Sequence, residues 1–176
     1  MKPFQRYFEV ILKNESDVGH LYAAPEIPYF NELTRKRFDS WEPIAVTLRG
    51  GRAADLMDCP KGFNICTTRL RDAIQQALGP KDEVQWLEFH ATFPDGRQET
   101  CWAISLYKSF DVLDHEKTLW LKDYPRRPVF DSRKAEGHHL FQYMPGDPFF
   151  AVSGDMKRVM DRFDCAAYGF TQREVV

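Results

Sequence analysis

The chain has 176 residues, of which 43% are hydrophobic and 28% are charged, and this composition is typical of a globular protein and excludes a disordered chain. The 24 basic and 26 acidic residues leave a net charge of −2, whereas a dedicated nucleic-acid-binding domain carries a basic excess. We therefore expect one domain that spans residues 1–176 and has no nucleic-acid partner.

The first half of the chain predicts two strands and two helices. Alternate positions are mostly apolar over residues 4–12 and again over residues 43–49, which is the pattern of a strand with one buried face. Residues 28–38 predict a short helix that ends at polar residues. A clearer helix is expected over residues 68–78, because apolar side chains recur there at helical spacing and a Gly-Pro pair follows.

The strongest strand signal lies in the middle of the chain. Residues 84–93 and 98–107 are rich in aromatic and aliphatic side chains and flank a Pro-Asp-Gly turn at residues 94–96. This arrangement predicts a β-hairpin within the main sheet. Trp86 and Trp102 fall in its two arms and are expected to help fill the core.

The second half predicts more short strands and a last helix. The strands are expected over residues 110–113, 119–121, 140–143 and 149–152, and the helix over residues 154–163 with Ser153 as its N-cap. Strands and helices do not alternate strictly along the chain, and the strand-rich order contains a clear hairpin. The sequence therefore predicts a single α+β domain, with a largely antiparallel β-sheet and two or three packed helices.

The cysteines and the lengths of the apolar runs indicate the cellular compartment of the protein. The four cysteines contain no CxxC pair and have apolar or small neighbours, so we expect buried, reduced thiols and no disulfide. The longest uninterrupted apolar runs have four residues, whereas a membrane-spanning helix needs about 20. The first residues also lack a hydrophobic leader. These features predict a cytoplasmic protein with no membrane segment.

The sequence contains no nucleophile elbow, no phosphate-binding loop and no zinc-protease signature. One group of residues supports an alternative function, a metal-assisted hydrolase that uses Asp111, Asp131 and either His138 or His139. Carboxylates and imidazoles bind divalent metals and act as general acids and bases. Adjacent histidines in an extended chain diverge, however, so at most one of the pair faces a shared site.

Several short segments resemble a known family. These segments are the run Phe110-Asp111-Val112-Leu113-Asp114, the stretches at 129–132 and 137–141, the stretch at 151–153 that leads into the last helix, and residues 65–70 at the transition from a strand to a helix. Together they are similar to the bacterial polymorphic-toxin immunity proteins of the eleventh class. The resemblance covers residues 41–170.

The resemblance implies a cytoplasmic bacterial protein made beside a toxin that is delivered between competing bacteria. Such a protein binds its cognate toxin and neutralises it by stoichiometric steric inhibition. From the residues themselves we also expect no enzymatic activity, no cofactor and no bound metal, because no catalytic motif is present and the candidate ligands lack metal-binding spacing. Two alternatives remain open, the metal-assisted hydrolase and a structural subunit of a secretion-linked assembly.

The toxin-binding surface is expected at two polar connections, residues 114–117 and 123–127. Both are charged and lie between apolar strands, and charged rims steer the encounter of two proteins. The candidate binding residues are Asp114, Glu116, Lys117, Asp123, Arg126 and Arg127.

Overall fold

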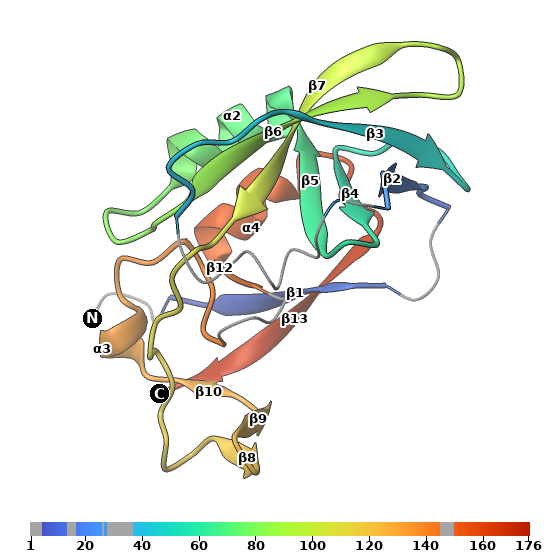
Figure 1. Cartoon of the computed structure of the whole chain (residues 1–176). Coiled ribbons are helices and arrows are strands. Elements are labelled where there is room, and N and C mark those ends of the chain that lie inside the picture. Colours follow the sequence, from blue (N-terminus) through green and yellow to red (C-terminus); the bar gives the residue numbers. More distant parts are fainter. Residues whose placement is uncertain (1–4, 14–16, 26, 28–36, 145–149) are drawn as a thin grey trace.

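A computed structural model of the chain describes residues 5–13, 17–25, 27, 37–144 and 150–176 (Figure 1). These residues form three β-sheets and three helices. Most strand pairs are antiparallel, and the predicted α+β class with a largely antiparallel sheet is confirmed. Among the described residues, no helix has the length and apolar character needed to cross a lipid bilayer.

The larger sheet has six strands in the order β2-β3-β6-β7-β5-β4. Their bounds are β2 His20–Ala23, β3 Ile44–Arg49, β4 Leu56–Cys59, β5 Phe63–Thr67, β6 Gln85–Thr92 and β7 Gln98–Ser105. Only β3 and β6 pair in parallel within this sheet, and the other neighbours are antiparallel.

The predicted hairpin is present as β6 and β7. The two strands pair antiparallel over their whole length, and Gly96 adopts a φ of 82° in the turn, where a side chain would be strained. Trp86 and Trp102 are half-buried against the core. Their indole N–H groups donate to Gln75 and Thr68 of the helix α2 (Thr68–Ala77), so both side chains lie on the side of the sheet that α2 covers.

The second sheet has five strands in the order β10-β13-β1-β12-β11. Their bounds are β1 Tyr7–Leu12, β10 Val129–Phe130, β11 Leu140–Phe141, β12 Phe150–Ser153 and β13 Tyr168–Val175. The first strand of the chain therefore pairs with the last, and β10 joins β13 in parallel. Both faces of β1 are covered, because Val10 belongs to the main core cluster and Tyr7 to a second core cluster on the opposite face.

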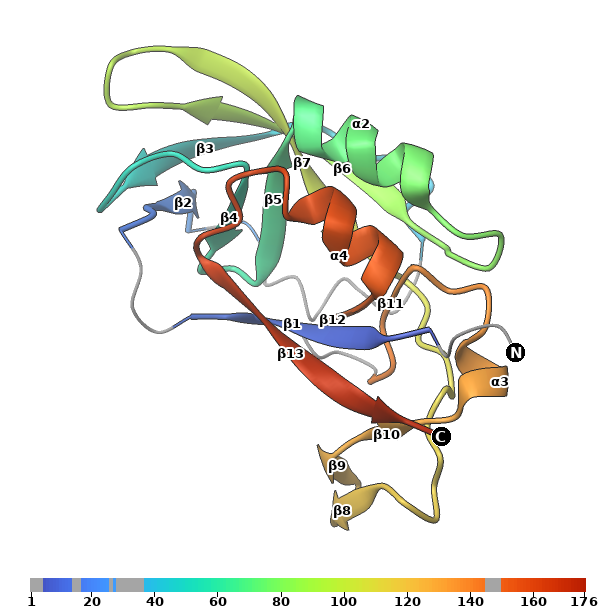
Figure 2. The ribbon, with the colours of Figure 1, turned by 180° about the vertical axis from the view of Figure 1, so that it is seen from behind.

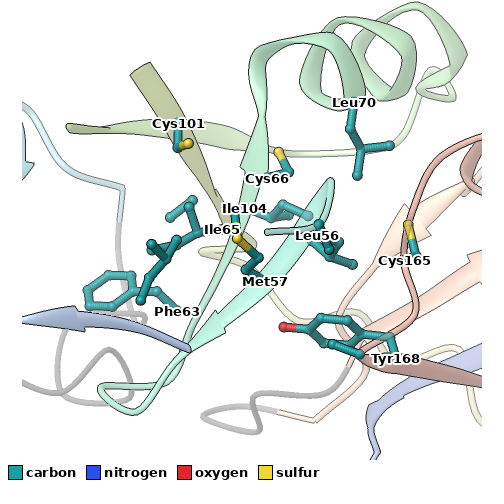
Figure 3. Close-up of a cluster of buried hydrophobic side chains, with 14 of the residues drawn as sticks. Leu56, Met57, Phe63, Ile65, Cys66, Leu70, Cys101, Ile104, Cys165 and Tyr168 are labelled. Atoms are coloured by element: carbon teal, nitrogen blue, oxygen red, sulfur yellow. The ribbon is translucent and has the colours of Figure 1, made fainter. Parts of the chain in front are cut away.

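The helix α4 (Gly154–Met160) connects the two sheets. It packs against α2 on one side and against β1 and β12 on the other (Figure 2). Side chains from both sheets and from α2 meet in the main core cluster, which includes Leu56 of β4, Leu70 of α2 and Tyr168 of β13 (Figure 3). All four cysteines are buried and unpaired, and burial raises the pKa of Cys101 and of Cys165 to about 12.

Some predicted elements differ from the structure. The strand predicted over residues 110–113 is wrong, since the Val112 N–H bonds to Phe110 O in a tight turn and the adjacent Val112 and Leu113 are both buried. The last helix ends at Met160, three residues earlier than predicted. The first strand begins at Tyr7. Residues 28–36 of the predicted helix over 28–38 lie outside the described residues.

Candidate protein-interaction surface

The segment that follows β7 forms a projecting ribbon of two strands. β8 (Leu119–Leu121) and β9 (Tyr124–Arg127) pair antiparallel and make a separate sheet. Figure 1 shows this ribbon at the end of the molecule away from α2 and the β6–β7 hairpin. A two-residue turn joins the strands, and its first residue, Lys122, has a φ of 54° in the left-handed region.

The base of the ribbon is fastened to the second sheet. The Asp114 N–H donates to Val129 O at 2.8 Å, and the Val129 N–H donates to the Thr118 hydroxyl at 3.1 Å. Leu113 forms an antiparallel bridge with Phe130. Since Val129 and Phe130 form β10, which pairs with β13, the position of the ribbon is set by the core of the protein.

The two faces of the ribbon have different environments. Trp120 and Pro125 lie opposite each other on the inner face, where Pro125 is buried and Trp120 packs against the second core cluster and stacks on His115. On the outer face Leu119, Leu121 and Tyr124 are exposed by 59%, 60% and 46%. They make up three of the five exposed large hydrophobic side chains in the described part of the chain, and we call these three residues with Lys122 and Arg126 the ribbon face.

The ribbon is basic within an acidic chain. From Leu119 to Arg127 it carries three basic residues and one acidic residue, whereas the whole chain has a net charge of −2. Arg127 pairs with Glu174 at 3.3 Å. Lys122 and Arg126 are exposed and form no ion pair with any residue that the structure describes. The ribbon face therefore combines exposed apolar side chains with two cations whose charge no residue in the described part of the chain neutralises.

The six predicted binding residues lie along this ribbon. Arg126 and Arg127 are on β9, Asp123 is in the turn at its tip, and residues 114–117 form a turn at its base. Asp114 has a structural role, because its carboxylate accepts hydrogen bonds from the Glu116 and Lys117 N–H groups, each at 3.0 Å. Glu116 and Lys117 are exposed, and Lys117 lies 3.9 Å from Asp114.

Leu119, Leu121 and Lys122 lie outside the predicted binding segments, and Tyr124 lies within the predicted segment 123–127 but was not among the candidate binding residues. The sequence signal that could have identified Leu119 and Leu121 is the Leu-Trp-Leu segment of β8. This segment places apolar side chains on both faces of a very short strand. A strand in a two-stranded ribbon buries only one of its faces, so one apolar face must be exposed. The sequence does not show that this strand lies outside the main sheets.

The residues of the hydrolase alternative have separate structural roles. The Asp111 carboxylate pairs with His115 at 2.7 Å and with Lys134 at 3.0 Å, and these contacts hold its pKa below the usual range. Asp131 is the N-cap of the short helix α3 (Ser132–Ala135), where backbone N–H groups lower its pKa. Across the described residues, no three His, Cys, Asp or Glu side chains are grouped so that they could hold a metal ion.

The two adjacent histidines face different partners, as expected for an extended chain. His138 is buried between the rings of Phe110 and Phe141 and beside Asp82. Nδ1 of His139 lies 3.0 Å from the hydroxyl of Ser153. That hydroxyl also accepts a hydrogen bond from the Met156 N–H and so caps α4, as predicted for Ser153.

A hollow of about 540 Å³ lies at the start of α2, between Asp55, Arg69 and Arg97. Its charged groups already have partners. The buried Asp55 carboxylate binds the Arg69 guanidinium through two bonds of 2.6 Å and also accepts from Thr67. Burial alone would raise the pKa of Asp55, but these hydrogen bonds outweigh it and keep the pKa below its usual value.

Arg97 pairs with Glu99 at 2.6 Å and lies over the ring of Phe93. The Asp55 contacts join the segment before β4 to the end of β5 and to α2, and the Arg97 contacts lie within the β6–β7 hairpin. The hollow therefore serves the fold, and the ribbon face is the candidate interaction surface. No protein-family model and no curated protein sequence matches the chain.

Proposed function

We propose that this protein is a bacterial immunity protein that binds a cognate toxin and neutralises it as a stoichiometric, non-catalytic inhibitor. The observation that carries the proposal is the ribbon face, on which three large hydrophobic side chains are exposed beside two cations that have no ion-pair partner among the residues described. Exposed apolar patches with a polar surround are typical of protein-binding surfaces. The resemblance of residues 41–170 to immunity proteins supplies the class of partner.

Inhibition in this proposal is steric. A stable interface buries roughly 800 Å² on each partner, and most of its binding energy comes from a few aromatic, aliphatic or Arg side chains near its centre. Leu121, Tyr124 and Arg126 are side chains of this kind, on a ribbon that the core holds in place. The charged residues around them, Glu116, Lys117, Asp123 and Arg127, are suited to form the rim.

The hydrolase alternative is not supported by a specific observation. Asp131 caps a helix, Asp111 pairs with Lys134, and His138 is buried beside Asp82. These contacts use the polar groups that a hydrolytic site would have to direct at a substrate. We therefore propose binding alone.

The test is co-expression of this chain with the toxin encoded by the adjacent gene, followed by titration of the purified toxin. We expect rescue of growth and a stable complex. Toxin activity should fall linearly with added protein and vanish near one equivalent, because each molecule blocks one toxin. Protection at far below one equivalent, without a stable complex, would instead indicate enzymatic reversal of the damage and would reject the proposal.

A further inference from the structure

The shape of the ribbon face suits insertion into a groove on the surface of another protein. Side chains alternate between the faces of a strand, so Tyr124 lies on the face opposite the buried Pro125, and Arg126 is exposed at the irregularity of the ribbon where Leu119 pairs with Arg127. Leu121 is paired with Tyr124 across the ribbon and extends the same apolar surface. The result is a narrow row of apolar side chains on a projecting element, which fits a concave partner surface.

The ribbon is also held in one conformation. Trp120 stacks on His115 with ring centroids 5.3 Å apart and contacts the second core cluster, and hydrogen bonds to Val129 fix the base. An element that is ordered before binding loses little conformational entropy when it docks. The ribbon face is therefore suited to carry binding energy by itself.

Charge decides between a foreign partner and a second copy of this chain. A symmetric dimer through the ribbon face would bring Lys122 and Arg126 of one copy close to the same cations of the other, and like charges across an interface are costly. A partner with carboxylates around an apolar groove would instead neutralise both cations. Charge complementarity thus favours a groove with an acidic rim.

The turn of the ribbon argues against insertion into a lipid bilayer. Lys122 and Asp123 occupy the tip, and both are exposed charged side chains. Insertion of the tip would take both charges, including a carboxylate, out of water, which is unfavourable. The apolar side chains lie along one side of the ribbon, where a protein groove can enclose them while the charged tip remains at its hydrated rim.

Resting on the proposed function, we propose that the ribbon face docks into an apolar groove of the cognate toxin whose rim is acidic. Leu119, Leu121 and Tyr124 fill the groove, and Lys122 and Arg126 meet carboxylates on its rim. In this arrangement the apolar residues govern how long the complex lasts, and the two cations govern how fast it forms.

The experiment measures binding of the purified toxin encoded by the adjacent gene to four proteins. These are the unaltered chain, Leu121→Ser, the double variant Lys122→Glu/Arg126→Glu, and the control Tyr22→Ser. Tyr22 is also an exposed large hydrophobic residue, at 41%, but lies on β2 of the other sheet. All three changes are at exposed positions, so the thermal unfolding midpoints should stay close together.

We expect Leu121→Ser to weaken binding at least about 10-fold, mainly through faster dissociation. The double charge reversal should slow association about 10-fold and reverse the sign of its salt dependence, whereas Tyr22→Ser should bind like the unaltered chain. If the unaltered chain binds and all variants bind equally well, the ribbon proposal is overturned while the inhibitor proposal stands. If the unaltered chain does not bind the toxin, both fail.

Two further outcomes would overturn the ribbon proposal. One is binding to vesicles of phosphatidylcholine and phosphatidylglycerol in about a 3:1 ratio that is lost in Leu121→Ser, which would make the ribbon a membrane contact. The other is a dimer of the unaltered chain in sedimentation that Leu121→Ser dissociates, which would make the ribbon face a self-association surface.

Discussion

Oδ1 of Asp82 lies 3.5 Å from Nδ1 of His138, and both side chains are shielded from solvent. Burial lowers the pKa of His138, and this effect outweighs the opposing attraction of Asp82. In the folded protein His138 thus stays uncharged at pH values at which a histidine of an unfolded chain, with a pKa of about 6.5, takes up a proton.

The free energy of unfolding should therefore fall as the pH is lowered from about 7 to about 5, because the unfolded chain binds a proton that the folded chain does not. His138→Gln should flatten this dependence, and urea titrations at several pH values measure it. The matched control is His90→Gln, since His90 is exposed. Equal slopes for His138→Gln and the unaltered protein would contradict the assignment.

Asp55 joins three segments of the chain and should be important for stability. Asp55→Ala removes the acceptor for the Thr67 hydroxyl and the Asp164 N–H and breaks the pair with Arg69. We expect a loss of about 2 kcal/mol in the free energy of unfolding. Asp155→Ala, which removes an exposed pair with Arg158, should cost less than about 1 kcal/mol. Similar losses in the two variants would argue against this role.

Gly79 lies where two loops touch. A Cβ atom at this position would be 2.3 Å from Gly137 O and 2.5 Å from Cδ2 of His139, so Gly79→Ala must move the loop and should cost about 2 kcal/mol. Gly154→Ala is the control, because its Cβ would meet nothing closer than 3.6 Å and alanine favours the helix. Urea denaturation should show destabilisation in the first variant alone.

Asp114 is expected to stabilise the base of the ribbon and not to bind a partner directly. Asp114→Ala should cost about 1 kcal/mol and speed hydrogen exchange at the Glu116 and Lys117 amides, because both lose their acceptor. Asp114→Asn keeps a side-chain oxygen and should retain slow exchange. Glu116→Ala should leave stability unchanged within about 0.5 kcal/mol. Fast exchange in Asp114→Asn would show that the cap depends on charge.

Elements with strong local signals were predicted correctly from the sequence. The hairpin arms at 84–93 and 98–107 became β6 and β7, and the helix expected over 68–78 became α2. In both cases a regular apolar pattern and a Gly or Pro at the boundary lie within one short segment. Such signals need no information from the rest of the chain.

Elements that depend on remote partners were predicted poorly. The eight-residue strand β13 was not among the predicted strands, because its pairing with β1 joins two segments far apart in the chain. The mostly apolar residues 110–113 look like a strand locally, but the bridge of Leu113 with Phe130 and the turn at Val112 decide their conformation. An alternating apolar pattern does not show whether a segment will have a neighbouring strand with which it can form hydrogen bonds.

By itself, the sequence determined the α+β class, the central hairpin, the main helix and the charged segments at 114–117 and 123–127. Only the tertiary structure decided that Leu119, Leu121 and Tyr124 are exposed, that Asp114 is a cap, and that Lys122 and Arg126 have no ion-pair partner among the described residues. The physical reason is that burial and ion pairing are set by contacts between segments far apart in the chain. An apolar pattern specifies which side chains favour burial, but whether a face is covered depends on where the strand lies in the folded protein.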